Sequence, residues 1–297
     1  MRAVRIIIGC MRFPELTLQE LDAFVKTAID AGFNMFDHAD IYGGNGLSEQ
    51  MFGQVSNTYQ RQQLILQSKC GICKDGVYKW YNFSKKHIIE RVEQSLENLK
   101  TDYLDILLLH RPDVLADLDE IAEAFSELKK SGKVLLFGLS NHTAQHFDYI
   151  QSALSDKLVA NQVQLSLGHS LLIDSLMYAN TNRLEATEKD GGVLLYCKKN
   201  NINIQAWSPF QYGMFEGVFL NNPKFMELNK VLDDLAAKYQ VSKEAIAGAW
   251  VLRIAPNVQV ITGTTKRERL LQVFEASTFE LTRREWYNLY FAERAPL

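Results

Sequence analysis

Short apolar segments alternate along this chain with longer segments of helical periodicity. The apolar segments carry Ile, Val, Leu and Phe at consecutive positions, which is typical of strands buried on both faces of a parallel sheet. We predict strands at residues 5–9, 33–37, 64–69, 103–110, 134–140, 159–165, 202–208 and 258–263.

The segments between these strands have the marks of amphipathic helices. Thr17 and Glu20 form a capping-box pattern, and the helix that they open stops at Gly32. Ser84 and Asp117 are equivalent start signals for two later helices. We predict further helices at residues 191–200, 224–239, 242–253, 266–277 and 283–293, and one after Thr143.

Eight strands that alternate with helices predict an α/β fold, and the number eight favours a (β/α)8 TIM barrel. A single domain over residues 1–297 suits this length, and no Pro-, Gly- or Ser-rich linker interrupts the chain. The alternative is a doubly wound sheet, which needs a Gly-x-Gly-x-x-Gly turn after its first strand. That turn is missing after residue 9, and the glycines at 43–49 have a different spacing. The long, poorly periodic segment 165–192 is expected to wall the active site or a cofactor.

Composition and charge narrow the class of protein. The 297 residues have a formal net charge of −3 and are 47% hydrophobic, as in ordinary globular proteins. The charge argues against a nucleic-acid partner, and the apolar runs are too short to span a membrane. Because the N-terminus lacks a signal-peptide pattern, we expect a cytoplasmic protein. The sequence does not fix the oligomeric state, although a monomer is slightly favoured.

Two groups of possible metal ligands have simpler interpretations. Cys70 and Cys73 form one Cys-x-x-Cys, but a zinc or redox site needs a second ligand pair or a thioredoxin-like context. His142 and His146 are four apart on an expected helix, without the glutamate of a His-Glu-x-x-His motif. We therefore interpret the cysteines as packed residues and the histidines as solvated helix residues, and we expect no metal.

Polar residues follow nearly every predicted strand. In a barrel, the carboxyl ends of all strands meet at one mouth, where the active site lies. One polar residue at a strand end is usually a turn former, but such residues at seven strands in chain order are harder to explain in this way. These residues are Asp37, Lys69, His110, Ser140, Asn141, Asn161, Gln162, Trp207, Ser208, Gly263, Thr264 and Thr265.

Four of the side chains at and near these ends suit proton transfer. A tyrosine has an ordinary pKa near 10, and a neighbouring ammonium lowers it. Lys69 would lose its charge when buried unless Asp37 pairs with it. Lys69 can then act on the phenol of Tyr42, which exchanges a proton with the substrate, while His110 orients a carbonyl oxygen or shares the transfer.

The chain resembles the aldo-keto reductase superfamily over nearly its whole length, and most resembles the bacterial oxidoreductases of that superfamily. The motifs that carry this resemblance are FDHADIYGGNGLSEQMFG (36–53), SKCG (68–71), TDYLDILLLHRPD (101–113), GKVLLFGLSNH (132–142), NQVQLSL (161–167), INIQAWSPF (202–210) and VITGTTKRERL (260–270). The resemblance implies a (β/α)8 barrel that binds NADPH and reduces aldehydes and ketones by hydride transfer. Because the chain starts at the first barrel strand, we expect no N-terminal hairpin that plugs the barrel.

The resemblance also implies roles for individual residues. Tyr42 matches the proton donor, and Asp37, Lys69 and His110 match its three partners. Ser140, Asn141 and Gln162 match residues that bind the nicotinamide carboxamide, and Trp207 matches the ring that stacks on it. The pyrophosphate would lie along Ser208, Pro209 and Phe210. The adenosine 2′-phosphate would lie at Gly263, Thr264, Thr265, Lys266 and Arg269, where cations suit a phosphate.

Two departures from the family pattern affect these expectations. The family motif Asp-Thr-Ala is Asp37-His38-Ala39 here, and strand alternation turns His38 to the face opposite Asp37, so we expect it to pack. Gln272 and Val273 stand where the family often has Glu-Asn, which leaves the adenine contacts open.

The substrate and two rival functions stay open at this stage. Met11, Trp80 and Tyr81 lie in the loops expected to flank the mouth, so we expect them to contact a small-molecule carbonyl substrate. One rival is a regulatory barrel that senses the nicotinamide cofactor with little turnover. The other is an isomerase or lyase in which Lys69 forms a Schiff base.

Overall fold

The structure is a computed structural model that describes residues 5–294. Eight strands within this range form a closed barrel in the order β1–β10–β9–β8–β7–β6–β3–β2. The pairings with a known register in this barrel are parallel. The predicted (β/α)8 barrel is therefore confirmed, and the doubly wound alternative is wrong. The expectation about an N-terminal plug concerns positions before Arg5, which lie outside the described residues.

The barrel strands agree with the predicted segments to within two residues at each end. They are β1 (Ile6–Gly9), β2 (Met35–Asp37), β3 (Ile65–Cys70), β6 (Leu104–Leu109), β7 (Val134–Ser140), β8 (Ala160–Gln164), β9 (Asn203–Trp207) and β10 (Val258–Thr262).

The helices match most of the predicted periodic segments. They are α1 (Leu18–Asp30), α2 (Leu47–Val55), α3 (Lys85–Leu99), α4 (Leu118–Lys130), α5 (Ala144–Gln151), α6 (Leu171–Met177), α7 (Val193–Asn200), α8 (Met226–Tyr239), α9 (Lys243–Leu252), α10 (Arg267–Phe274) and α11 (Arg283–Phe291). None of the helices between residues 5 and 294 is long and apolar enough to cross a membrane.

Two compact units make up the described chain. The first, called here the N-terminal unit, comprises residues 7–162 and 263–267. The second, called the C-terminal unit, comprises residues 5–6, 163–262 and 268–294. The assignment of residues 1–297 to one domain stays a prediction.

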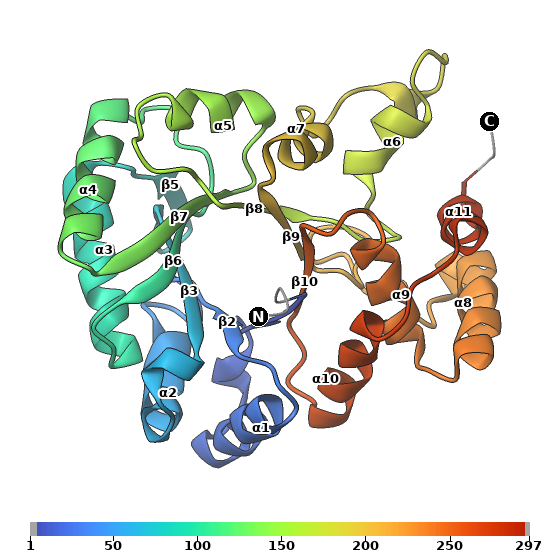
Figure 1. Ribbon diagram of the computed structural model, residues 1–297, viewed down its shortest axis with the longest axis horizontal. Coiled ribbons are helices and arrows are strands. Elements are labelled where there is room, and N and C mark those ends of the chain that lie inside the picture. Colours follow the sequence, from blue (N-terminus) through green and yellow to red (C-terminus); the bar gives the residue numbers. More distant parts are fainter. Residues whose placement is uncertain (1–4, 295–297) are drawn as a thin grey trace. The chain divides into compact units, whose positions relative to one another are not determined.

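In the N-terminal unit, β2, β3, β6 and β7 lie side by side, with α2, α3 and α4 along them (Figure 1). Residues of β3 alternate between two environments. Gln67 and Lys69 lie on the face of β3 that carries Asp37 across the β2–β3 pair, whereas Ser68 donates from the other face to Glu49 of α2. This alternation decides which side chains reach the site.

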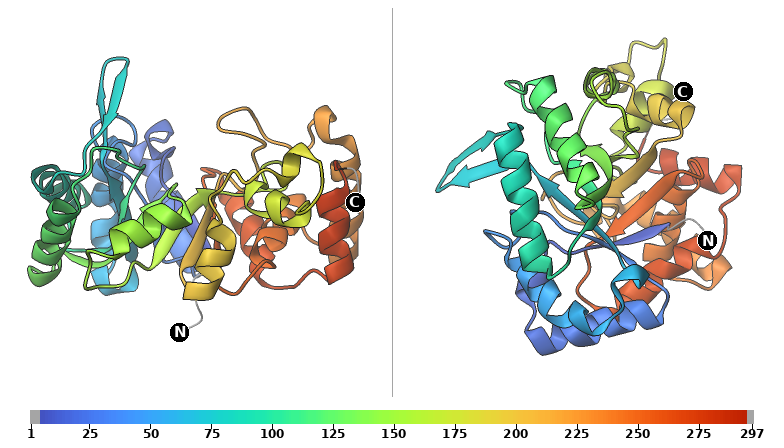
Figure 2. Two further views of the ribbon diagram at one scale, coloured as in Figure 1. Left: turned by 90° about the horizontal axis from the view of Figure 1, so that it is seen from above. Right: turned by 60° about the vertical axis from the view of Figure 1, so that its left-hand side comes forward.

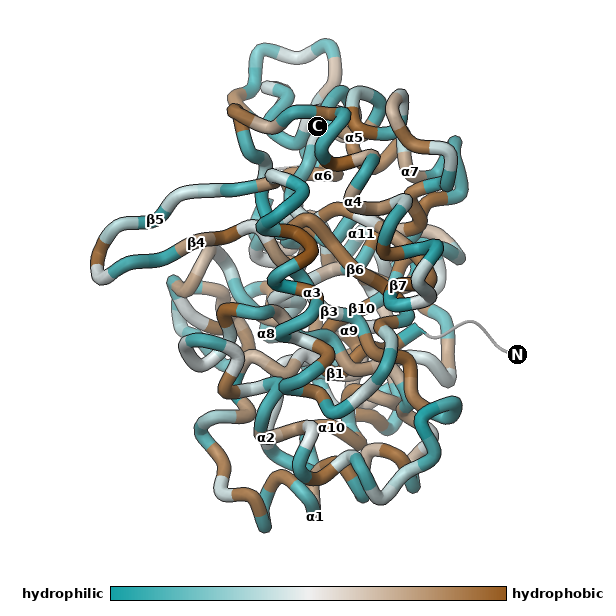
Figure 3. The backbone as a smooth tube through the Cα atoms, turned by 90° about the vertical axis from the view of Figure 1, so that its left-hand side faces the viewer, coloured by the Kyte–Doolittle hydropathy of each residue, from teal (hydrophilic) through white to brown (hydrophobic). Residues whose placement is uncertain are grey.

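Two elements of the N-terminal unit escaped the sequence analysis. Helix α2 follows β2, and its N-cap is Gly46, which has a left-handed φ of 76° and no side chain to cap the helix. An antiparallel hairpin of β4 (Ile72–Asp75) and β5 (Tyr78–Tyr81) follows β3. Figures 2 and 3 show this hairpin standing out from the rest of its unit. It occupies the segment for which only a loop was expected.

The C-terminal unit contains the paired strands β9 and β10 and helices α6 to α9 and α11. The rings of Trp250 and Trp286 stack at a centroid distance of 5.0 Å, and each indole N–H donates to the other residue's carbonyl oxygen. The segment 165–192 includes α6. Arg294 anchors it by donating to the Leu167 carbonyl (2.9 Å) and the Ser170 hydroxyl (2.6 Å).

Candidate active site

The carboxyl ends of β2 and β3 bring a buried acid and a buried base together. The Lys69 Nζ donates to both carboxylate oxygens of Asp37 at 2.8 Å and to the His38 carbonyl at 2.6 Å. Both side chains are almost fully buried. The ion pair expected from the sequence is therefore present in the N-terminal unit.

Tyr42 and His110 complete a cluster around this pair. Tyr42 lies in the turn after β2, and the Lys69 Nζ is 5.0 Å from the centre of its ring. His110 follows β6, and its ring meets that of Tyr42 edge-on at a centroid distance of 6.1 Å. The structure thus brings together the four residues that were predicted to act in proton transfer.

Charges in this cluster are set by burial and by the ion pair. Burial alone would lower the pKa of Lys69, but Asp37 and Tyr42 outweigh it and raise the pKa above its ordinary value. Burial raises the pKa of the Tyr42 phenol, and the Lys69 ammonium opposes that rise. Lys69 therefore stays charged. It acts on Tyr42 in the expected direction, although burial has the larger effect.

The imidazole of His110 is neutral at physiological pH. Burial, followed by the positive charges of Lys69 and Arg111, holds its pKa well below the ordinary value. Its Nδ1 is buried without a hydrogen-bond partner among the described residues. A neutral imidazole can donate one hydrogen bond to an oxygen beside Tyr42.

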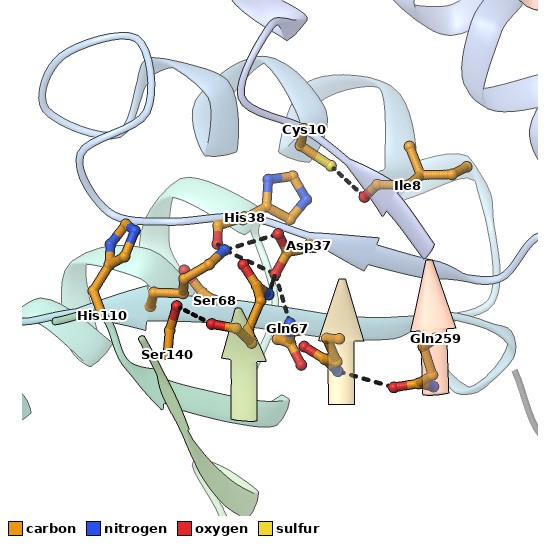
Figure 4. Close-up of polar contacts among 12 residues, drawn as sticks. Ile8, Cys10, Asp37, His38, Gln67, Ser68, His110, Ser140 and Gln259 are labelled. Atoms are coloured by element: carbon orange, nitrogen blue, oxygen red, sulfur yellow. Dashed lines mark hydrogen bonds and ion pairs between the residues drawn. The ribbon is translucent and has the colours of Figure 1, made fainter. Parts of the chain in front are cut away.

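Two glutamines also donate to Asp37, and Figure 4 labels one of them, Gln67. The Gln162 Nε2 lies 2.9 Å from Asp37 Oδ1, and the Gln67 Nε2 lies 2.5 Å from the same oxygen. The sequence analysis did not identify Gln67. The signal was available, because alternation along β3 places position 67 on the same face as Lys69.

The ends of β7 and β8 form a connected polar group. The Asn141 Nδ2 donates to the His110 carbonyl (3.2 Å) and the Ser140 hydroxyl (2.9 Å), while the Ser140 Oγ donates to the Gln162 carbonyl (3.0 Å). Asn141 has a left-handed backbone with φ of 63°. Ser140, Asn141 and Gln162, predicted together, are therefore neighbours.

The segment after β10 forms a second part of the N-terminal unit's site. Arg12 donates to the Gly263 carbonyl (3.1 Å), and the Lys266 N–H donates to the Thr264 hydroxyl (3.1 Å). Thr265 lies between Thr264 and Lys266 in the sequence, and the side chains of Lys266 and Arg267 are exposed. Arg267 is a further cation here that the sequence analysis did not name.

The remaining predicted cofactor residues belong to the C-terminal unit. Trp207 ends β9, and Ser208 follows with a left-handed φ of 51°. The Phe210 carbonyl beyond Pro209 accepts the Phe219 N–H (3.1 Å). In α10, the Arg269 Nε lies 3.6 Å from a Glu244 carboxylate oxygen. Nearby, Gln272 is exposed and Val273 is buried.

The predicted substrate residues are exposed. Met11 follows β1, while Trp80 and Tyr81 lie on β5. Trp80 pairs across the hairpin with Cys73, so the two share the face where the Cys73 Sγ meets His87 of α3 (3.5 Å). Tyr81 is on the opposite face. Burial lowers the pKa of Arg111, and Tyr81 acts on Arg111 in the opposite direction. The two aromatic residues therefore face different surroundings.

Three open questions from the sequence concern residues outside the cluster. His38 packs against the rings of Phe13 and Phe52, as expected. His142 is buried before α5, so the prediction of two solvated helix histidines is wrong for it. Cys70 is buried and Cys73 half-buried, both as free thiols. Among residues 5–294, no three His, Cys, Asp or Glu residues group in a way that could hold a metal ion.

Known proteins resemble this chain along nearly its whole length. A family model described as the aldo/keto reductase family matches residues 5–290. Oxidoreductase YdhF of Escherichia coli is 36% identical, over 96% of this chain and 92% of its own. The 6-dehydroglucose reductase of Agrobacterium fabrum is 30% identical, over 96% and 93%. A crystal structure of an aldo-keto reductase from Klebsiella pneumoniae in complex with NADPH has a TM-score of 0.76 at 23% identity, covering 99% of this chain and 92% of that one. This chain therefore belongs to the aldo/keto reductase family.

Proposed function

We propose that this protein is an NADPH-dependent reductase that converts aldehydes or ketones to alcohols, with Tyr42 as the proton donor. One observation carries the proposal: the buried Asp37–Lys69 ion pair lies against the ring of Tyr42, with His110 edge-on to the same ring. A fixed ammonium beside a phenol stabilises the phenolate that forms when the phenol gives up its proton.

In this mechanism, the chain's own residues hold and move one proton. When bound, the nicotinamide would supply a hydride to the carbonyl carbon. The raised pKa of Tyr42 keeps its phenol protonated before the reaction. The phenol donates to the carbonyl oxygen, and Lys69 stabilises the phenolate that remains. His110, which is neutral, donates a hydrogen bond to the same oxygen and orients it.

The residues at the strand ends fit a nicotinamide cofactor. The Nδ2 group of Asn141 and the Nε2 group of Gln162 donate to protein atoms, and amide oxygens are the acceptors that suit a carboxamide NH₂. Together with Ser140 they would hold the carboxamide. Trp207 would stack on the ring, and Ser208, Pro209 and Phe210 would follow the pyrophosphate.

The 2′-phosphate of NADPH would bind at the segment after β10. Gly263, Thr264 and Thr265 offer backbone and hydroxyl donors, and Lys266 adds an exposed cation. Arg269 would also contact this phosphate, in competition with its neighbour Glu244. The NADPH bound to the Klebsiella pneumoniae enzyme supports this choice of cofactor.

The substrate is a small carbonyl compound that enters past Met11, Trp80 and Tyr81. The activity named for the Agrobacterium fabrum relative, a reductase, supports this class. Replacing Trp80 or Tyr81 with Leu should change substrate preference, measured as ratios of kcat/KM across aldehydes, more than NADPH affinity. The reverse pattern would remove these residues from the substrate site.

A regulatory barrel with little turnover is the second candidate, and it is favoured only if nucleotide binds without reduction. The Schiff-base reading needs a neutral lysine. Lys69 is instead a charged group that is held by three hydrogen bonds. Borohydride trapping, followed by mass spectrometry, would detect an imine at Lys69 if that reading were right.

The deciding experiment is NADPH oxidation with a nitrobenzaldehyde, with Tyr42→Phe measured beside the wild type. We expect turnover in the wild type and a loss of roughly 10²-fold or more in the variant, since general acids contribute about that much. Equal turnover in both proteins would remove Tyr42 from its role. Saturable NADPH binding without turnover in either would favour the regulatory barrel.

We also propose that the enzyme works in the cytoplasm as a monomer. The four cysteines are free thiols, which persist in a reducing compartment. Fractionation of cells and sedimentation of the purified protein test the two statements separately.

A further inference from the structure

Gln67 occupies a position in β3 that the catalytic proposal does not use. In the parallel pair of β2 and β3, its Cα is the direct partner of the Asp37 Cα. Its side chain is fully buried, and its Nε2 donates to Asp37 Oδ1 at 2.5 Å. It therefore lies next to Asp37, on the same face of the strand as Lys69.

Asp37 Oδ1 accepts more hydrogen bonds than the ion pair requires. Lys69 (2.8 Å), Gln162 (2.9 Å) and Gln67 all donate to this oxygen, and Lys69 also donates to Oδ2 (2.8 Å). Two of the three donors on Oδ1 are neutral amides. A neutral donor disperses the charge of a carboxylate without adding a charge of its own.

We propose that Gln67 is a positioning residue, which holds the Asp37 carboxylate and partly offsets its charge so that the Lys69 ammonium acts on Tyr42. The inference rests on the proposed function, in which Tyr42 is the proton donor. Without the Gln67 N–H, the negative charge of Asp37 would cancel more of the Lys69 field at the phenol.

The sign of the effect follows from the dipole. The positive end of the Gln67 amide points to Asp37, so its removal makes the potential at Tyr42 more negative and disfavours the phenolate. The ionisable groups that act on Tyr42 are Lys69, Asp37 and Cys10, and His110 lies edge-on to its ring. The test changes none of these groups directly.

The test compares Gln67→Met, which keeps the length of the side chain without the donor, with a matched control. The control is Gln205→Met, because Gln205 is another fully buried barrel glutamine, whose Nε2 donates to Gln259 (3.2 Å) and which belongs to the C-terminal unit, whereas Tyr42 belongs to the N-terminal unit. Both changes remove a buried amide, so both lower stability. Only the first should act on Tyr42.

The main measurement is the titration of Tyr42 by NMR with ¹³Cζ-labelled tyrosine, assigned with Tyr42→Phe. In Gln67→Met, the midpoint should rise by about half a pH unit or more, and in Gln67→Glu by more still, because a like charge is added. The basic limb of the pH profile of kcat should move in the same direction. In Gln205→Met, both should stay at the wild-type values.

An unchanged Tyr42 midpoint in Gln67→Met, with a stability loss equal to that of Gln205→Met, would overturn the inference and leave Gln67 a packing residue. The titration needs no turnover. If the wild type proved inactive towards carbonyl compounds, the proposed function would fail, while the NMR midpoint would still decide whether Gln67 acts on Tyr42.

Discussion

The buried acids on the two faces of strands β2 and β3 have different partners. On one face, Asp37 is paired with the charged Lys69. On the other, Glu49 of α2 is equally buried but accepts from the neutral Ser68 (2.6 Å) and Asn98 (3.3 Å), and burial raises its pKa. The difference lies in the cation. Lys69 donates directly to Asp37, whereas Arg91, the cation that acts on Glu49, does so through its charge and is itself paired with Asp40.

The largest test of this contrast removes the cation. Lys69→Met should reduce turnover at least about 10²-fold and lower the free energy of unfolding by about 3–5 kcal/mol, because Asp37 is left buried and unpaired. Carbonyl-dependent NADPH oxidation and urea unfolding measure the two effects. The double variant Asp37→Asn, Lys69→Met should regain stability but not activity. Recovery of activity in it would refute the need for the charge.

The next largest effect is expected on the pH dependence of stability when His38, on the face that packs against α2, is replaced. Burial lowers its pKa to about 3, and neither ring nitrogen has a hydrogen-bond partner among the described residues. A lowered folded pKa gives stability that is present above the unfolded pKa of about 6.5 and is lost as the pH falls towards 3. The free energy of unfolding of the wild type should therefore fall between pH 7 and pH 4. In His38→Phe, this fall should be smaller by roughly 2–3 kcal/mol. Urea unfolding at several pH values measures this, and an equal pH dependence of the free energy of unfolding in the two proteins would contradict it.

Glu49 should show the smallest effect, and with the opposite pH dependence. Its raised pKa means that its contribution to stability is present below the unfolded pKa of about 4.3 and is lost as the pH rises through the folded pKa. The free energy of unfolding of Glu49→Gln should therefore rise relative to that of the wild type between pH 4 and pH 8. Turnover should stay within about threefold of the wild-type value, since Glu49 is not among the proposed catalytic residues. A loss comparable to that of Lys69→Met would erase the distinction between the faces.

The strands and the main polar cluster were predictable because each depends on a local pattern. Consecutive apolar residues mark the barrel strands, and Asp37, Lys69 and His110 stand at strand ends. Helix α2 was missed because Gly46 precedes it in place of a capping side chain. The hairpin was missed although Asp75-Gly76 is a turn signal, since its strands have only four residues each.

Contacts between side chains of different helices and strands could not be predicted from the sequence patterns. The hydrogen bond from the Gln67 amide to the Asp37 carboxylate depends on the register that sets Gln67 opposite Asp37. The burial of His142 depends on α5 beginning only at Ala144, which leaves the histidine in the preceding turn. The neighbour Glu244 of Arg269 comes from another helix, α9. Periodicity shows which face a residue occupies, but not which side chain meets it there.

The hairpin β4–β5 has a consequence for protein engineering. Within residues 5–294, its two strands pair only with each other, and its base is closed by the hydrogen bond from the Asn82 N–H to the Gly71 carbonyl (3.0 Å). Gly71 has a φ of 101°, and a side chain there would collide with the Phe83 ring. Between these two fixed ends, the segment can be exchanged for another of different length without breaking a barrel hydrogen bond. Under the proposed assignment of Trp80 and Tyr81 to the substrate site, the hairpin is a segment for library design that leaves Asp37, Tyr42, Lys69 and His110 unchanged.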